Sequence, residues 1–140
     1  MSEYGVIYIK VLPPKGSASE WLRYCYIFHS LPKSIQENIK YIATHINSKY
    51  ADDIVIPMDI SLHPGCIATP NKVEEIAKDM YSQYSDMMNR QGLTNCVRCV
   101  YSIGQLSDVN VNSTHQLDGE VIVKVGRFLD ESDEPGLFNI

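Results

Sequence analysis

The chain has 140 residues, of which 44% are hydrophobic and 21% are charged, and its formal net charge is −5. This length and composition are typical of one globular domain with its own core, and they exclude a disordered chain. The 12 basic residues form no cluster, which argues against nucleic-acid binding. Because no apolar run approaches the ~18 residues that span a bilayer, we expect no membrane segment.

The N-terminal residues, MSEYGVIYIK, show no basic stretch ahead of an apolar one, so we expect no secretory signal. The 4 cysteines are therefore expected to be free thiols in a cytoplasmic protein. A bias toward Ile, Asn, Tyr and Ser indicates an AT-rich genome, such as that of a phage or a low-GC bacterium.

The first third of the chain predicts two strands and a helix. Residues 4–12 alternate and are rich in β-branched side chains, which indicates a strand. Residues 20–31 are ambiguous, because the capping-box spacing of Ser17 and Glu20 favours a helix whereas the run of Tyr, Cys, Ile and Phe favours a strand. We predict a strand here, paired with the first as a hairpin. A helix follows over residues 31–50.

The rest of the chain predicts a strand over residues 52–62, a loop leading into a second helix over 69–92, a strand from residue 95, and a hairpin over 109–129 that turns at Asp118-Gly119. The order β-β-α-β-α-β-β-β indicates an α+β fold. We expect a two-layer domain with a mixed or mostly antiparallel sheet and two main helices on one face. We expect residues 1–129 to form a single domain and residues 130–140 to form an acidic tail with an apolar tip.

Two pairs of residues have the spacing of zinc ligands. His63 and Cys66, together with Cys96 and Cys99, form an H-x2-C and C-x2-C pattern. In a strand, however, residues i and i+3 point to opposite faces and cannot share an ion. We therefore predict no metal and no cofactor, with Cys99 in the core and Cys96 half-exposed, and keep a structural zinc as the alternative.

The same His63 and Cys66 flank a Pro-Gly turn ahead of a helix. A cysteine near a helix N-terminus with a base beside it could act as a nucleophile. No arginine and no glycine-rich phosphate loop accompanies the pair. We predict no catalytic residues, and keep a small enzyme or ligand-binding protein that uses this loop as the alternative function.

Aromatic and apolar side chains favour a different main hypothesis. Tyrosine is enriched at protein interfaces, and apolar anchors on a tail can dock on a partner. The predicted interface residues are Tyr8, Tyr24, Tyr26, Leu137, Phe138 and Ile140. The main hypothesis is a non-catalytic binding or assembly protein that self-associates or docks on a larger complex, as a homo-oligomer or with a protein partner.

Overall fold

The computed structural model describes residues 3–107, 109 and 117–140. Its elements in chain order are β1 (Glu3–Val11), α1 (Ala18–Ser30), α2 (Lys33–Lys49), β2 (Ile54–Ile56), β3 (Gly65–Ala68), α3 (Val73–Arg90), β4 (Val97–Gln105), α4 (Glu120–Glu131) and β5 (Gly136–Asn139). The strands form one sheet in the order β2-β3-β1-β4-β5. All neighbours pair antiparallel except β4 and β5, which are parallel. The predicted α+β fold with a mixed, mostly antiparallel sheet is confirmed.

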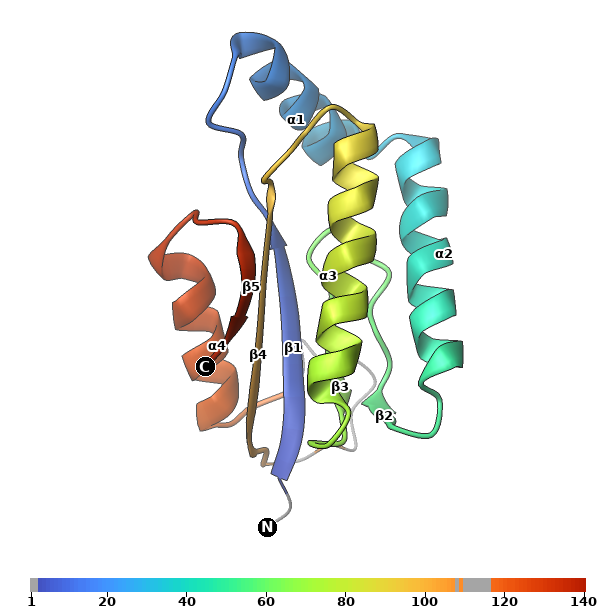
Figure 1. Cartoon of the computed structure of the whole chain (residues 1–140), viewed down its shortest axis with the longest axis vertical. Helices are drawn as coiled ribbons and strands as arrows, with labels where there is room; N and C mark the ends of the chain where they lie inside the picture. Colours follow the sequence, from blue (N-terminus) through green and yellow to red (C-terminus); the bar gives the residue numbers. More distant parts are fainter. Residues whose placement is uncertain (1–2, 108, 110–116) are drawn as a thin grey trace.

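Helices lie on both faces of the sheet (Figure 1). The predicted pair of main helices, α2 and α3, packs on one face, where Ile7 and Ile9 of β1 and Cys99 of β4 are buried against them. On the other face, Val6 of β1 and Val100 of β4 are buried with apolar residues of α4. Because successive strand residues point to opposite sides, β1 and β4 supply side chains to both cores.

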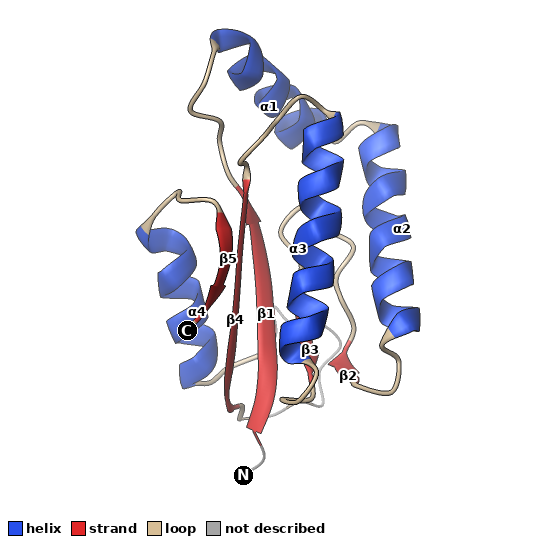
Figure 2. Cartoon of the chain, viewed as in Figure 1, coloured by secondary structure: helices blue, strands red, loops and turns tan. Residues whose placement is uncertain are grey.

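The strand predicted over residues 20–31 is wrong, since Ala18–Ser30 forms helix α1. The backbone N–H of Glu20 donates to Ser17 Oγ at 3.3 Å, and the N–H of Ser17 donates to Glu20 Oε1 at 3.3 Å. The capping box therefore outweighs the β propensity of the residues that follow. Of the residues of α1 only Ile27 is buried, and the helix extends past the end of the sheet (Figure 2). The first predicted hairpin does not exist.

Two further predictions are corrected around the middle of the chain. Strand β2 ends at Ile56, because Pro57 has no N–H to donate to a neighbouring strand. The predicted loop after residue 62 contains strand β3, which lies between β2 and β1.

The second strand of the hairpin predicted over residues 109–129 is helix α4, whose buried residues Val121 and Val125 are one helical turn apart. The first strand of that hairpin lies almost wholly outside the described residues. Near the C-terminus, Gly136–Asn139 pairs with Arg98 to Tyr101 of β4 as strand β5. The segment predicted as a tail therefore contributes a strand to the sheet.

Candidate functional site

The structure does not bring the predicted zinc ligands together. Cys66 lies on β3 and Cys99 on β4, with β1 between them, so two strand spacings of ~4.8 Å separate their backbones. Zinc holds its sulfur ligands at ~2.3 Å, so these two thiols are too far apart to share an ion. Cys96 is 2% exposed, which corrects the prediction that it is half-exposed. Within the described part of the chain, no three His, Cys, Asp or Glu residues are grouped so that they could hold a metal ion.

The environment of Cys66 and His63 does not suit nucleophilic chemistry. Cys66 is fully buried, and burial raises the pKa of its thiol to about 12. Its Sγ lies 3.6 Å from the carbonyl oxygen of Ile56. His63 turns toward β1, where its Nδ1 accepts a hydrogen bond from the backbone N–H of Val11 at 3.1 Å. Cys66 is therefore a protonated core thiol at neutral pH rather than a reactive thiolate.

The predicted interface residues lie on three different elements. Tyr8 on β1 is half-buried on the α4 face, whereas Tyr24 on α1 packs against the core beneath α2 and α3. Tyr26 on α1 is 50% exposed. The three tyrosines thus form no common face. The other three, Leu137, Phe138 and Ile140, are half-buried in or beside β5 and pack within the chain itself.

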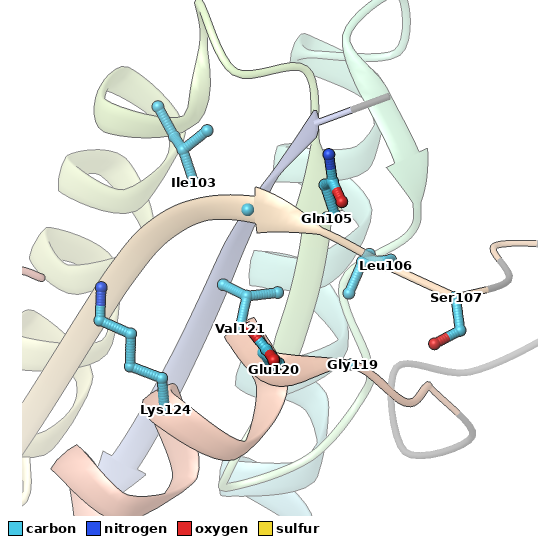
Figure 3. Close-up of a pocket in the computed structure, with 9 residues that line it drawn as sticks. Ile103, Gln105, Leu106, Ser107, Gly119, Glu120, Val121 and Lys124 are labelled. Atoms are coloured by element: carbon cyan, nitrogen blue, oxygen red, sulfur yellow. The ribbon is translucent and has the colours of Figure 1, made fainter. Parts of the chain in front are cut away.

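A groove beside α4 forms a candidate site, part of which is shown in Figure 3. It consists of two adjoining depressions of about 570 and 840 Å³, which share four lining residues, Ser107, Gly119, Glu120 and Lys124. One depression lies between the end of β4 and the first turn of α4. The other runs along α4 to the C-terminal residue, Ile140. We call the two together the α4 groove.

Two glycines allow α4 to lie close to β4 at this groove. A Cβ on Gly104 would lie 2.8 Å from the Cβ of Val121 in the first turn of α4. Gly119, which precedes the helix, has φ +144°, and a Cβ there would lie 3.1 Å from the carbonyl oxygen of Gln105. A φ of +144° is strained for any residue that carries a side chain, so this position requires glycine. The close packing of α4 against β4 sets the shape of the smaller depression, which Gly104, Gly119 and Val121 line.

The groove combines apolar surface with two cations. Ile103 on β4 is 47% exposed and Val123 on α4 is 48% exposed. Lys124 and Arg127 are spaced i, i+3 on α4 and line the same groove. Within the described residues, neither cation has a hydrogen bond or an ion pair. Three carboxylates, Asp118, Glu120 and Glu131, complete the lining.

Sequence reasoning missed these residues because it assigned them to a strand. In a strand, Lys124 and Arg127 would point to opposite faces, and no site would be expected. The helical spacing of Val121, Val125 and Phe128 is the signal that could have placed both cations on one helix.

Comparison with known proteins finds a similar fold in a solved structure. No family model matches the chain, and no curated protein matches it. Among solved structures, a bacterial light-regulated adenylyl cyclase matches with a TM-score of 0.53 at 14% sequence identity. The match covers 89% of this chain and 38% of the cyclase chain, so this chain spans well under half of that protein's length. At this identity, the match shows a shared fold.

This finding corrects the main hypothesis of a non-catalytic assembly protein. The fold occurs in a regulated enzyme, which fits the alternative of a small enzyme or ligand-binding protein better. The tyrosine-rich hairpin that supported assembly is also absent, because residues 18–30 are helical. The comparison gives no support to a phage origin or to oligomerisation, and a homo-oligomer or protein partner stays a prediction. No helix among the described residues is long and apolar enough to cross a membrane.

Proposed function

We propose that this chain is a ligand-binding domain of the sensory or regulatory kind, and that the α4 groove binds a small amphipathic organic anion. One observation carries the proposal. Two cations without partners in the described structure, Lys124 and Arg127, line the same groove as the exposed side chains of Ile103 and Val123. Apolar walls with a few convergent polar groups are typical of small-molecule sites.

The size and charge of the groove narrow the ligand class. Depressions of about 570 and 840 Å³ lie within the range of ~300–1,000 Å³ that is usual for sites of organic ligands. The two cations can pair with a carboxylate or sulfonate. The three carboxylates of the lining would repel a ligand that carries several negative charges, such as a nucleoside triphosphate. A ligand with one anionic group and an aromatic or aliphatic body fits best.

The likeness of fold supports the regulatory part of the proposal. The matching cyclase is light-regulated, and this chain corresponds to 38% of its length. A domain of this size can bind a signal molecule while a separate part of a protein carries the catalytic activity. We include a cytoplasmic location in the proposal, which the four free cysteines of the structure support.

Binding of anilinonaphthalene sulfonate (ANS), which has one sulfonate and an aromatic body, tests the proposal. We expect ANS fluorescence to rise on titration with the protein. The double variant Lys124→Ala/Arg127→Ala should weaken ANS affinity about tenfold, because each cation is expected to contribute ~0.5–1 kcal/mol at a partly exposed site. The matched control is Lys78→Ala, which removes an exposed cation from α3 and should leave the affinity unchanged.

A second control accounts for the exposed apolar residues of α1. Trp21 and Leu22 are 49% and 68% exposed and could bind ANS on their own. The variant Trp21→Ser/Leu22→Ser should keep the component of binding that depends on Lys124 and Arg127. Unlabelled ATP should displace ANS poorly. Equal ANS affinity in the wild type and the Lys124→Ala/Arg127→Ala variant would show that the groove is not the site.

A further inference from the structure

Arg98 on β4 is a buried cation with an unusual set of contacts. Its side chain is enclosed, with the residue 2% exposed, and its guanidinium lies over the rings of Phe128 and Phe138, at 4.2 and 4.6 Å from their centroids. The two rings also contact each other edge to face. Nη1 donates to the carbonyl oxygen of Glu134 at 2.7 Å, and Nη2 donates to that of Phe128 at 2.9 Å. No carboxylate among the described residues forms an ion pair with it. We call this arrangement the Arg98 clamp.

All of these contacts connect β4 to the last turn of α4 and to the segment that follows. A cation at a helix C-terminus is stabilised by the exposed carbonyls of the last turn. Lys10 of β1 lies opposite Arg98 of β4 in the register of the two strands. Its Nζ donates a hydrogen bond to the carbonyl oxygen of Leu129 at 3.4 Å. It also lies 3.8 and 3.9 Å from carboxylates of Asp130 and Asp133. Two neighbouring strands thus present one cation each to the same C-terminal segment.

The C-terminal residue is held at the other end of β5. The backbone N–H of Ile140 donates to the carbonyl oxygen of Tyr101 at 3.1 Å. Ser102, which is 1% exposed, donates from Oγ to the main-chain oxygen of Ile140 at 2.7 Å. Strand β5 is therefore attached to β4 at its start by the Arg98 clamp and at its end by Ser102.

The α4 groove shares two wall residues with this attachment. Phe128 lines the larger depression and covers one face of Arg98. Ile140 lines the same depression and accepts the hydrogen bond of Ser102. Ile140 keeps its place only while β5 is docked on β4, and Phe128 loses its contact with the ring of Phe138 when β5 is released.

We propose that ligand binding in the α4 groove is coupled to docking of strand β5, and that the Arg98 clamp sets the docked state. This inference rests on the proposed function of the groove. A ligand that contacts Ile140 stabilises the docked form, because release of β5 removes that contact and frees the ring of Phe128 from Phe138. Coupling between two equilibria is reciprocal, so if the ligand favours docking of β5 by a given factor, docking of β5 raises the ligand affinity by the same factor.

Hydrogen–deuterium exchange of the backbone amides of residues 137–140 tests the coupling in the full-length chain. Arg98→Met, which keeps the apolar stem and removes both hydrogen bonds, should speed this exchange more than tenfold and weaken ANS severalfold. Saturating ANS should slow the exchange severalfold in the wild type. The matched control is Arg90→Met at the exposed C-terminal end of α3, which should change neither quantity. Unchanged exchange in β1 and β3 shows that the rest of the sheet is intact.

Phe138→Leu provides a second variant in case Arg98→Met does not fold. It keeps the cation and removes one of the two rings, and it should change exchange and ANS affinity in the same directions. If ANS binds through Lys124 and Arg127 but neither variant alters its affinity, and ANS leaves the exchange of β5 unchanged, the coupling is refuted while the proposed function stands. If ANS does not bind the groove at all, the proposed function fails and the coupling fails with it.

Discussion

Replacing Gly104 by alanine tests how closely α4 is seated on β4. The new Cβ would lie 2.8 Å from the Cβ of Val121 and 3.1 Å from its Cγ2. Carbon atoms in favourable contact are ~3.5–4.0 Å apart, so these separations are too short by several tenths of an ångström. The Cβ of Val121 is fixed to the backbone, so no change of rotamer relieves the closer contact. The first turn of α4 must move away from the sheet.

The expected cost follows from two opposing effects. Overpacking of this kind typically destabilises a core by ~1–3 kcal/mol. Replacing glycine by alanine within a strand contributes ~0.5–1 kcal/mol in the other direction, since the unfolded chain loses freedom. We expect Gly104→Ala to lower the free energy of unfolding by about 1–2 kcal/mol, and to weaken ANS binding because Gly104 and Val121 both line the groove.

Urea unfolding followed by circular dichroism measures this difference. The control is Gly126→Ala on α4, where a Cβ would have no atom within 4 Å. That variant should gain ~0.5–1 kcal/mol from helix propensity alone. If Gly104→Ala is as stable as the wild type while Gly126→Ala behaves as expected, the close seating of α4 is wrong.

Three further predictions concern other parts of the chain. Ser17→Ala should cost about 1 kcal/mol in urea unfolding, because it removes the side-chain half of the α1 capping box. In native protein, iodoacetamide should modify the half-buried Cys25 first and leave Cys66 unmodified until unfolding, as read by mass spectrometry; rapid labelling of Cys66 would contradict its burial. Burial raises the pKa of Asp79, but hydrogen bonds, including one from Tyr50 at 2.8 Å, outweigh this effect and hold that pKa below its ordinary value. The ionised Asp79 therefore stabilises the folded protein at pH values above the ordinary pKa of an aspartate, and this contribution is lost as the pH falls through the lower pKa of the folded state. Asp79→Asn should accordingly reduce the loss of folding stability measured in an acid titration.

The elements that could be predicted are those in which the spacing of the apolar residues matches the side chains that are buried. In α2 the isoleucines at 35, 39, 42 and 46 repeat at helical spacing, and all four are buried. Strand β1 alternates because it supplies side chains to two cores. In helix α3 the apolar residues also recur at helical spacing and are buried, although the helix starts at Val73, a few residues after the predicted start at residue 69.

The elements that were missed have residues whose local preference opposes their final structure. Helix α1 is rich in aromatic residues and exposes most of them, so their β propensity opposed the helix that the capping-box spacing of Ser17 and Glu20 favoured. Helix α4 contains four valine or isoleucine residues within its first six positions, which favour a strand in isolation. Packing of Val121 and Val125 on β4 outweighs that preference.

The burial of Arg98 depends on the helical structure of Glu120–Glu131. Alternation along β4 puts Arg98 and Cys99 on opposite faces, with Arg98 toward α4 and Cys99 toward α3. With a strand expected over residues 120–129, that face has no helix C-terminus to receive a cation. Once the segment is a helix, its last carbonyls and Phe128 lie over β4 and stabilise a buried arginine that has no carboxylate partner, although its Nε has no hydrogen-bond partner among the described residues. The role of Arg98 thus depends on a contact 30 residues away in the chain, which no local pattern around it could reveal.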